Sequence, residues 1–265
     1  MGSQLKTVPI QERPQPDMYR ARTGHALRND DSKLLEQLKK TQEYATVNKM
    51  KLNAKKTKFM VFNPRTSKDF MPAFVVDEKD IEVVEQTRLL GVVLRSDLSW
   101  SANTEDIVKR AYKKLWYLRR LKRLGVETPD LIDVYIKQIR SILEYAAPLW
   151  HSSISGEDRL RIERVQKAAL SIILGNSYTT YRVGLKLSGL EFLFERRRKL
   201  SLKFAKKSQK HPKFSQWFKL NTRQTVTRQI PPKFCPVVTR TVRFAKSPVS
   251  YFTSLLNSEH ENRSK

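Results

Sequence analysis

Two adjacent carboxylates, Asp30 and Asp31, are the residues whose type and spacing could hold catalytic metal ions. Paired carboxylates bind the divalent ions of two-metal phosphoryl transfer, but such a site needs a rigid frame and normally a third carboxylate. The neighbours Arg28, Asn29 and Ser32 are polar, which is typical of a helix start, where Asp and Ser cap the first turn. From these residues alone, the pair is interpreted as a helix cap and no metal site is expected.

Two dense runs of Lys and Arg indicate a different chemistry, the binding of phosphate groups. The first run falls within about four turns of one predicted helix and consists of Lys109, Arg110, Lys113, Lys114, Arg119, Arg120, Lys122 and Arg123. The second run lies on a later predicted helix and consists of Arg196, Arg197, Arg198, Lys199, Lys203, Lys206, Lys207 and Lys210. Few acidic residues lie within helical reach of the first run, so a polyanion is its expected partner. A solvated helix face and a nuclear-localisation stretch are the alternatives.

Aromatic side chains accompany these runs. Trp116, Tyr117 and Trp150 could stack on nucleic-acid bases. They also stand next to apolar stripes, which favours packing in the core or at its rim.

The charge of the chain is concentrated in its second part. The 265 residues carry a net charge of +26, and residues 101–265 hold 34 Lys and Arg against 13 Asp and Glu. A field this dense is self-repulsive unless a polyanion neutralises it, and nucleic acid is the commonest such partner. Anionic membrane is the rival, but no apolar run approaches the ~18 residues of a membrane span, so no membrane partner is expected.

The sequence lacks the residues or motifs for a disulfide, a cysteine metal site, a glycine-rich phosphate-binding loop or a nucleophile triad. Cys235 is the one cysteine, and the four histidines are scattered, so neither a disulfide within the chain nor a multi-cysteine metal site can form. No phosphate-binding G-x-x-x-x-G-K-[ST] loop and no supported nucleophile triad occurs. The polar stretch from Met1 to Asp17 is no secretory signal. We therefore expect an intracellular protein, in nucleus or cytoplasm, without a cofactor of its own.

The first hundred residues predict a helix and a small sheet. Residues 1–30 carry several prolines and little apolar periodicity, which indicates an irregular arm. A helix of about 15 residues should begin at Asp31 or Ser32 and end near Asn48. Short apolar runs at 59–62, 74–76, 81–84 and 89–94 then predict strands of a small antiparallel sheet.

After Thr104 the apolar period changes to that of helices. Thr104 could cap the first helix and Gly125 end it, and Thr128-Pro129 should start the second. A third helix is expected over 157–174 with Leu160 among its inward residues. A fourth is expected over 191–210 with Leu193, Leu200 and Phe204 inward. These four amphipathic helices predict a bundle, and residues 213–265 a loosely ordered tail.

An ordered series of motifs resembles a known family. Residues 51–62 read K-L-N-A-K-K-T-K-F-M-V-F. This string resembles the L-N-x-x-K-T-x-x-M-x-F stretch that follows the catalytic aspartates in reverse transcriptases of non-LTR retrotransposons, LINE elements of the jockey and chicken-repeat kind. Residues 89–94 with 97–100 are similar to that family's primer-grip hairpin, and residues 135–150 to its thumb helix. Residues 163–167 and 196–197 are similar to elements further on, so that the resemblance covers roughly residues 28–256.

The resemblance implies an RNA-directed DNA polymerase that uses Mg²⁺ when the family member is intact. It places Lys56 near the departing pyrophosphate, and Leu90 and Gly91 against the primer strand. The two basic helices would hold an RNA–DNA duplex.

The chain also departs from the family. The family's Tyr/Phe-x-Asp-Asp box stands about one helix before the L-N-x-x-K-T stretch, so Asp30 and Asp31 occupy its place. The resemblance thus replaces the helix-cap interpretation with a catalytic-box remnant. Arg28 and Asn29 stand where an aromatic and a small residue belong, and a polar stretch replaces the apolar strand that should lead into the box. The fingers, most of the palm and the earlier palm aspartate are not found, so no residue is expected to catalyse polymerisation alone.

A shorter similarity points elsewhere. The stretch from about Leu89 to Trp150 resembles the amino-terminal region attached to an AlkB-type tRNA-modifying oxygenase. Such an oxygenase holds iron through a His-x-Asp…His triad, which the sequence lacks. Oxygenase and methyltransferase activity are therefore not expected of this chain.

These observations predict an α+β protein, a small antiparallel palm remnant followed by a mostly helical thumb-like bundle. The expected domains are an irregular arm (1–30), a palm-end and primer-grip remnant (31–101), a basic helical thumb-like domain (102–212) and the tail (213–265). The expected function is that of a truncated reverse-transcriptase-like protein that binds template-primer, with RNA or an RNA–DNA duplex as partner and DNA as a further candidate. The alternatives are a non-enzymatic RNA- or DNA-binding module of retrotransposon origin, and a relic whose basic helices lack the palm to pack against.

Overall fold

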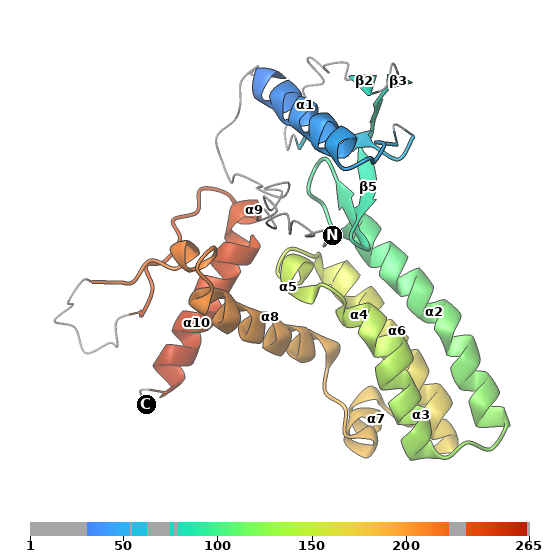
Figure 1. The fold of residues 1–265 in the computed structure, drawn as a ribbon. Helices are drawn as coiled ribbons and strands as arrows, with labels where there is room; N and C mark the ends of the chain where they lie inside the picture. The colour runs from blue at the N-terminus through green and yellow to red at the C-terminus, as the bar shows by residue number, and fades with distance from the viewer. Residues whose placement is uncertain (1–30, 54, 63–74, 77–78, 223–231, 264–265) are drawn as a thin grey trace, which may run out of the picture. The chain divides into compact units, whose positions relative to one another are not determined.

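The computed structural model describes residues 31–53, 55–62, 75–76, 79–222 and 232–263, whose helices and strands are traced in Figure 1. The chain divides into two compact units. The first comprises Met1–Thr57 with Phe70–Ile81, and the second comprises Lys58–Asp69 with Glu82–Lys265. The described part is mostly helical with small β pairs, which is compatible with the predicted α+β class.

The first unit contains a helix and one strand pair. Helix α1 spans Asp31–Val47, which confirms the helix predicted from Asp31 to about Asn48. Lys49 follows with a left-handed backbone, φ 55°, so the chain turns away just after the helix. Strands β2, Val75–Val76, and β3, Lys79–Asp80, pair antiparallel.

The strands of the second unit form two separate pairs. Strands β1, Lys58–Phe59, and β4, Glu82–Val83, pair in parallel, where an antiparallel sheet was expected. Strands β5, Gln86–Leu89, and β6, Val92–Arg95, pair antiparallel as a hairpin. The run 89–94 was predicted as one strand, and that prediction is wrong because a two-residue turn divides it. Both turn residues have positive φ, as the tightest hairpin turns require.

Helices make up most of the rest of the second unit. Their bounds are α2 Ser101–Arg123, α3 Thr128–Val134, the π-helix η1 Tyr135–Arg140, α4 Ser141–Glu144, α5 Ala147–Trp150, α6 Gly156–Leu174, the 3-10 helix η2 Gly175–Ser177, α7 Tyr181–Ser188, α8 Leu193–Lys210, the 3-10 helix η3 Ser215–Trp217, α9 Val242–Ala245 and α10 Pro248–Arg263. Helices α3, η1 and α4 follow one another without a break and form one rod that packs against α2 (Figure 1). Among the described residues, no helix is long and apolar enough to cross a bilayer.

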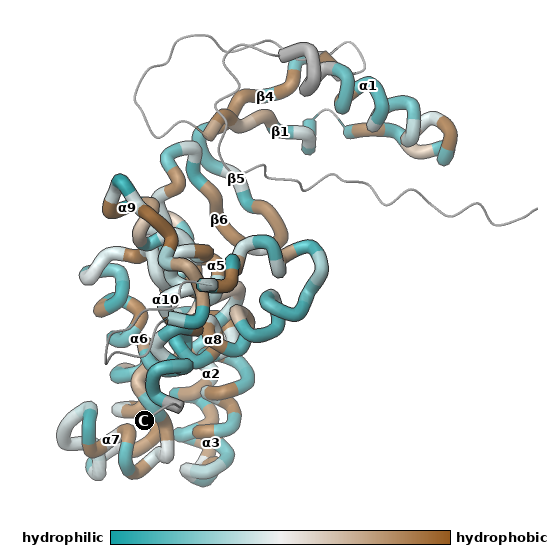
Figure 2. Tube along the Cα trace, turned by 90° about the vertical axis from the view of Figure 1, so that its left-hand side faces the viewer, coloured by the Kyte–Doolittle hydropathy of each residue, from teal (hydrophilic) through white to brown (hydrophobic). Residues whose placement is uncertain are grey.

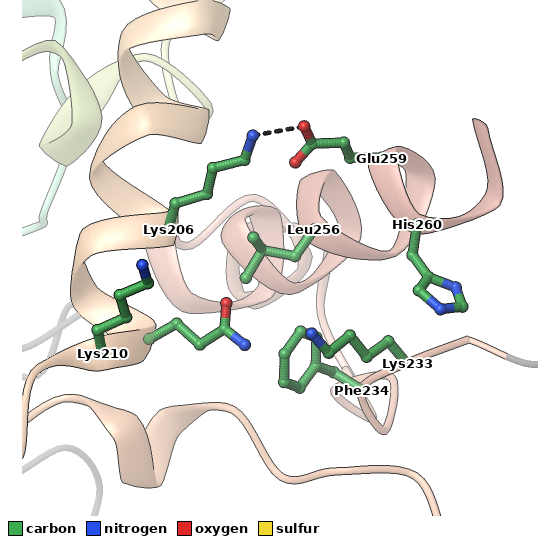
Figure 3. A pocket seen from close by; sticks show the side chains of 8 residues that line it. Lys206, Lys210, Lys233, Phe234, Leu256, Glu259 and His260 are labelled. Carbon is green, nitrogen blue, oxygen red and sulfur yellow. Dashed lines mark hydrogen bonds and ion pairs between the residues drawn. The ribbon is translucent and has the colours of Figure 1, made fainter. Parts of the chain in front are cut away.

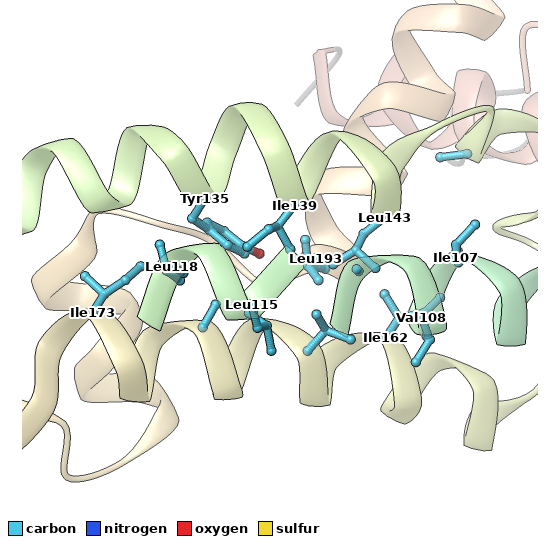
Figure 4. Packing of buried hydrophobic residues seen from close by; sticks show 14 of the residues in the cluster. Ile107, Val108, Leu115, Leu118, Tyr135, Ile139, Leu143, Ile162, Ile173 and Leu193 are labelled. Carbon is cyan, nitrogen blue, oxygen red and sulfur yellow. The ribbon is translucent and has the colours of Figure 1, made fainter. Parts of the chain in front are cut away.

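The main core lies between α2, the α3–η1–α4 rod and α6 (Figure 4). Its fully buried side chains include Ile107, Leu115, Leu118, Tyr135, Ile139, Leu143, Ile162 and Ile173. They recur every three or four residues, so each helix presents one continuous apolar face. Burying each such side chain contributes roughly 1.5–3 kcal/mol. This core is what holds α2 in place.

A second cluster orders part of the carboxyl-terminal segment. Helix α10 packs against α8, with Phe252 and Leu256 meeting Ala205 and Phe234. The Asn257 side chain accepts a hydrogen bond from the Phe234 backbone N–H at 2.9 Å and donates one to its carbonyl at 3.0 Å. Part of the described 213–265 segment, which was expected as a loosely ordered tail, is therefore packed against α8. Its apolar residues are spread along the sequence and meet only in the folded chain.

Several helix ends were predicted correctly and one was not. Helix α2 ends at Arg123, with Gly125 in the left-handed region at φ 81°, and Thr128-Pro129 begins α3 as predicted. Thr104 does not cap α2, because the helix already begins at Ser101 and Thr104 is buried in its first turn.

Two predicted inward residues point outward. Leu160 on α6 is 55% exposed and Phe204 on α8 is 40% exposed. Helix α8 instead buries a face made of Leu193, Arg197, Ser201, Ala205 and Ser208. Leu193 is the one residue of this face that had been predicted.

The core makes a testable contrast between two leucines. We expect Leu118→Ala, at a fully buried position of α2, to lower the free energy of unfolding by about 2–5 kcal/mol, because it removes apolar contacts and leaves a cavity. Leu160→Ala is the matched control, and it should change stability by less than about 0.5 kcal/mol since its side chain is exposed. Urea denaturation measures both, and equal losses would contradict this core.

Candidate nucleic-acid interface

The basic residues of α2 lie on the side of the helix away from the core. Lys109, Lys113, Arg119, Arg120, Lys122 and Arg123 are all exposed. No ion pair to these six side chains is found among the described residues. Hydrophilic and hydrophobic positions alternate along the helical tubes of the second unit, as Figure 2 shows. The apolar side chains of α2 are buried in the core, so the cations on the opposite side of the helix face solvent.

Arg110 and Lys114, the other two predicted cations of α2, are only partly exposed. Arg110 Nε lies 3.0 Å from Asp106 Oδ2. Lys114 Nζ lies 5.1 Å from the centre of the Tyr117 ring. Both cations therefore interact with groups of the same helix, which leaves them less available to a phosphate.

An ion pair joins the hairpin to α2. Arg88 on β5 donates from Nη2 to Asp106 Oδ1 at 2.5 Å and from Nη1 to Oδ2 at 3.0 Å. This forked contact lowers the pKa of the Asp106 carboxyl and raises that of the Arg88 guanidinium. Charge-assisted pairs of this geometry fix orientation as well as adding energy. The hairpin is thus held in one orientation against the basic helix.

A second contact places the hairpin's other strand. Asn103, buried in the first turn of α2, accepts a hydrogen bond from the backbone N–H of Val93 at 3.1 Å. Val92 and Val93 are themselves buried. The strand that follows the turn is thereby anchored on α2.

The turn of the hairpin is held by a residue far along the chain. Leu90 and Gly91 form the turn with φ 48° and 83°, and Leu90 is 73% exposed. The Tyr145 hydroxyl donates to the Leu90 carbonyl at 2.7 Å. A Cβ added at Gly91 would lie 3.2 Å from Tyr145 Cε1, so glycine leaves the room that the ring occupies. The two residues predicted to touch a primer strand therefore form a tip with a fixed backbone, at which Leu90 is exposed and Gly91 is partly buried.

Helix α8 gives fewer free cations than its sequence suggested. Arg197 was predicted to bind nucleic acid, but it is fully buried, with its guanidinium carbon 5.6 Å from the centre of the Trp150 ring. Arg196 Nε lies 3.1 Å from Glu144 Oε1, and Lys199 pairs with Glu191. Arg198 and Lys203 are exposed. Because phosphate cannot reach a buried guanidinium, Arg197 is removed from the interface.

A buried histidine lies beside Arg197. Arg197 Nε lies 3.5 Å from His151 Nδ1, and both side chains are buried. Burial and the charges of Arg197 and Arg159 lower the pKa of His151 to about 3. Burial also lowers the pKa of Arg197 to about 10, so at neutral pH the arginine is charged and the histidine is not.

One carboxylate fixes the start of α8. Glu163 on α6 accepts from the backbone N–H of Phe194 at 2.8 Å and from the Tyr181 hydroxyl at 2.5 Å. Gln166 continues the network, accepting from the Tyr135 hydroxyl at 2.5 Å and donating to Tyr181 at 2.9 Å. This network joins the rod, α6, α7 and α8, which positions the cations of α8 relative to the core.

A small basic pocket lies between the end of α8 and α10 (Figure 3). Its volume is about 290 Å³ and its lining residues are Lys206, Gln209, Lys210, Lys233, Phe234, Leu256, Glu259 and His260. Lys206 pairs with Glu259 across one side. The lysines at the end of α8 thus border this pocket.

The residues predicted near the polymerase centre lie partly outside the described structure. Asp30 is outside the described residues, and Asp31 is the first residue of α1. Lys56 is exposed in a turn of the first unit, where its backbone N–H donates to the Asn53 carbonyl at 3.0 Å. Among the described residues, no group of three or more His, Cys, Asp or Glu side chains could hold a metal ion.

Comparison with known proteins adds no relative: no protein-family model, no curated protein and no solved structure matches this chain.

The sequence did not identify several residues that build this interface. Tyr145, Asn103, Arg88 and Asp106 act through contacts between segments that are distant in sequence. Asn103 alone left a local signal, since a buried Asn in the first turn of an apolar helix face needs a hydrogen-bond partner. The other contacts follow only from the fold.

The hairpin turn can be tested by a pair of glycine substitutions. Gly91→Ala and Gly125→Ala both force alanine into the left-handed region, which costs about 1–2 kcal/mol each. A Cβ at Gly125 meets nothing within 4 Å, whereas one at Gly91 meets Tyr145. We therefore expect Gly91→Ala to lose more stability than Gly125→Ala in urea denaturation. Equal losses would show that the Tyr145 ring does not constrain the turn.

His151 predicts a loss of stability at mildly acidic pH. Its folded-state pKa of about 3 lies below the ordinary value near 6.5, so between these values the unfolded chain binds a proton that the folded chain does not. Stability should then fall as the pH drops from about 7 to 5, by at most about 1.4 kcal/mol per pH unit. In His151→Gln the dependence over this range should be flatter, measured by urea denaturation at each pH. An unchanged slope would contradict the buried neutral histidine.

Proposed function

We propose that this chain is a reverse-transcriptase-like protein of non-LTR retrotransposon type, and that it binds template-primer nucleic acid through the phosphate backbone. In this proposal the hairpin β5–β6 acts as a primer grip and the helices from α2 onward act as a thumb. The partner is RNA, an RNA–DNA duplex or DNA. The chain does not copy nucleic acid by itself.

The observation that carries this proposal is that the hairpin β5–β6 is attached to the basic helix α2 by side-chain contacts. Leu90 at the tip is exposed, while the backbone of the tip is fixed by Tyr145 and its strands by Asp106 and Asn103. A hairpin that grips a nucleic-acid strand needs a rigid tip beside a cationic surface. A tip that is already ordered loses little conformational entropy on binding and holds the strand in a defined position. The arrangement supports that use.

The cations of α2 supply the attraction. Six exposed Lys and Arg side chains line one helix without a carboxylate partner among the described residues. Neutralising about 6–8 phosphates with these six cations and the exposed Arg198 and Lys203 of α8 releases counterions and makes binding depend steeply on salt. This attraction needs no particular base sequence.

The sequence offers little for catalysis. The remnant box Asp30-Asp31 follows Arg28 and Asn29 and lacks the apolar strand that would hold two aspartates rigidly. We expect no primer extension by the purified chain on poly(rA)/oligo(dT) with Mg²⁺. DNA synthesis in that assay would contradict the proposed inactivity and show that the chain is a polymerase.

Charge removal on α2 gives the direct test of binding. The dissociation constant for an RNA–DNA duplex should weaken steeply between about 50 and 200 mM salt, with a slope in log–log form of roughly −5 to −7. The triple variant Lys109→Gln, Lys113→Gln, Arg120→Gln should flatten that slope by about 3, because three phosphate contacts are lost.

A variant with equal loss of charge elsewhere is the control. Arg164, Arg182 and Lys186 are exposed on α6 and α7. Changing these three to Gln removes the same net charge but should leave the slope nearly as in the original chain. If both triple variants flatten the slope equally, net charge and not α2 governs binding. If binding ignores salt altogether, the phosphate-backbone proposal fails.

A further inference from the structure

Three aromatic rings of α2 are open to solvent. Tyr112, Trp116 and Tyr117 are 41%, 57% and 55% exposed. Trp116 and Tyr117 meet edge to face with ring centres 5.1 Å apart, and Lys114 lies over the Tyr117 ring. Trp116 and Tyr117 are therefore not core residues, although their apolar neighbours favoured packing in the core or at its rim. Trp150 behaves in the opposite way, since it is fully buried and its Nε1–H donates to the Tyr145 carbonyl at 3.0 Å.

These rings alternate with cations along one face. Lys109, Tyr112, Lys113, Trp116, Arg120 and Arg123 follow helical spacing i, i+3, i+4, i+7, i+11 and i+14. Such residues share a face, and here it is the face opposite Ala111, Leu115 and Leu118 of the core. With Tyr117 beside them, we call these seven residues the α2 stripe. From Lys109 to Arg123 the stripe is about 21 Å long, the length of about six stacked nucleotides.

The composition of the α2 stripe identifies what covers it. Its exposed rings leave apolar area in water, which normally marks a binding surface. A protein partner or a second copy of this chain is disfavoured, because protein interfaces are depleted of Lys at their centres and a second copy would bring the same positive field. Aromatic faces set among cations fit a strand whose bases are free to stack and whose phosphates are negative.

We propose that the α2 stripe binds unpaired bases of single-stranded nucleic acid, with Trp116 and Tyr117 stacking on the bases while the surrounding cations hold the phosphates. This inference rests on the proposed function, because it assumes that α2 meets nucleic acid. It goes further by naming the form of the ligand. A paired duplex hides its base faces, so stacking on the α2 stripe needs a single-stranded stretch such as the overhang beside a primer, whereas the cations of the stripe can hold the phosphates of either form.

The test separates stacking from charge. The probes are an oligo(dT) of about 20 nucleotides and an abasic-spacer oligonucleotide of the same length and charge. The original chain should bind oligo(dT) at least about tenfold more tightly than the abasic probe, since stacking on an aromatic side chain stabilises each base. The double variant Trp116→Ala, Tyr117→Ala should bind both probes equally, at the affinity the original chain has for the abasic one.

Two further variants guard against loss of folding. Trp116→Phe keeps a ring and should retain part of the preference for oligo(dT). Leu160→Ala removes an exposed apolar side chain from α6 and should retain all of it. The double variant should unfold at the same temperature as the original chain, since both rings lie outside the core. Quenching of tryptophan fluorescence by oligo(dT), and not by the abasic probe, should disappear in Trp116→Phe.

The outcomes are distinguishable. If the original chain binds both probes equally, the stacking inference is overturned while the phosphate-backbone proposal stands. If the preference survives in the double variant, the bases stack elsewhere and the α2 stripe is not their site. If neither probe binds at low salt while the RNA–DNA duplex does, this inference fails and the phosphate-backbone proposal stands. If the duplex does not bind either, both fail.

Discussion

The packing of α2 against α6 and the α3–η1–α4 rod determines where every charge of the basic helix lies. Ala111, Leu115 and Leu118 are fully buried, and the pitch of the helix then dictates that residues half a turn away face solvent. A charged side chain could not take a core position without a large desolvation penalty. The apolar face and the cationic face are therefore two results of one constraint, and the hairpin is attached to the same helix through Asp106 and Asn103.

Much of this part of the fold could be predicted from the sequence, because its signals are local. Pro129 and Gly125 mark helix ends through backbone conformation alone, and the apolar period of α2 and α6 needs no knowledge of the partner. The division of the chain into four predicted domains stays a prediction. The outward direction of the α2 cations followed from the same periodicity.

Prediction from the sequence failed for α8, because the buried face of this helix is not apolar. Helix α8 buries Arg197, Ser201 and Ala205, while its larger Phe204 is partly exposed. Ala205 is covered by rings that α10 and the preceding segment bring from far along the chain, so its small size is matched by Phe234 and Phe252. Arg197 lies beside the neutral His151 and the Trp150 ring, while its Nη1 and Nη2 have no hydrogen-bond partner in the described part of the chain. Hydropathy along one helix contains no information about such partners, and the same holds for the ion pair of Arg88.

The hydrogen bond from Tyr145 to the Leu90 carbonyl also has a consequence for the order of folding. The hairpin closes through residues next to one another in sequence, which is rapid, whereas this contact joins residues 55 positions apart. The two strands can pair before the rod has formed, but the tip acquires its fixed orientation only after α2 and α4 have met. A nascent chain would thus carry a formed hairpin whose tip acquires its orientation last.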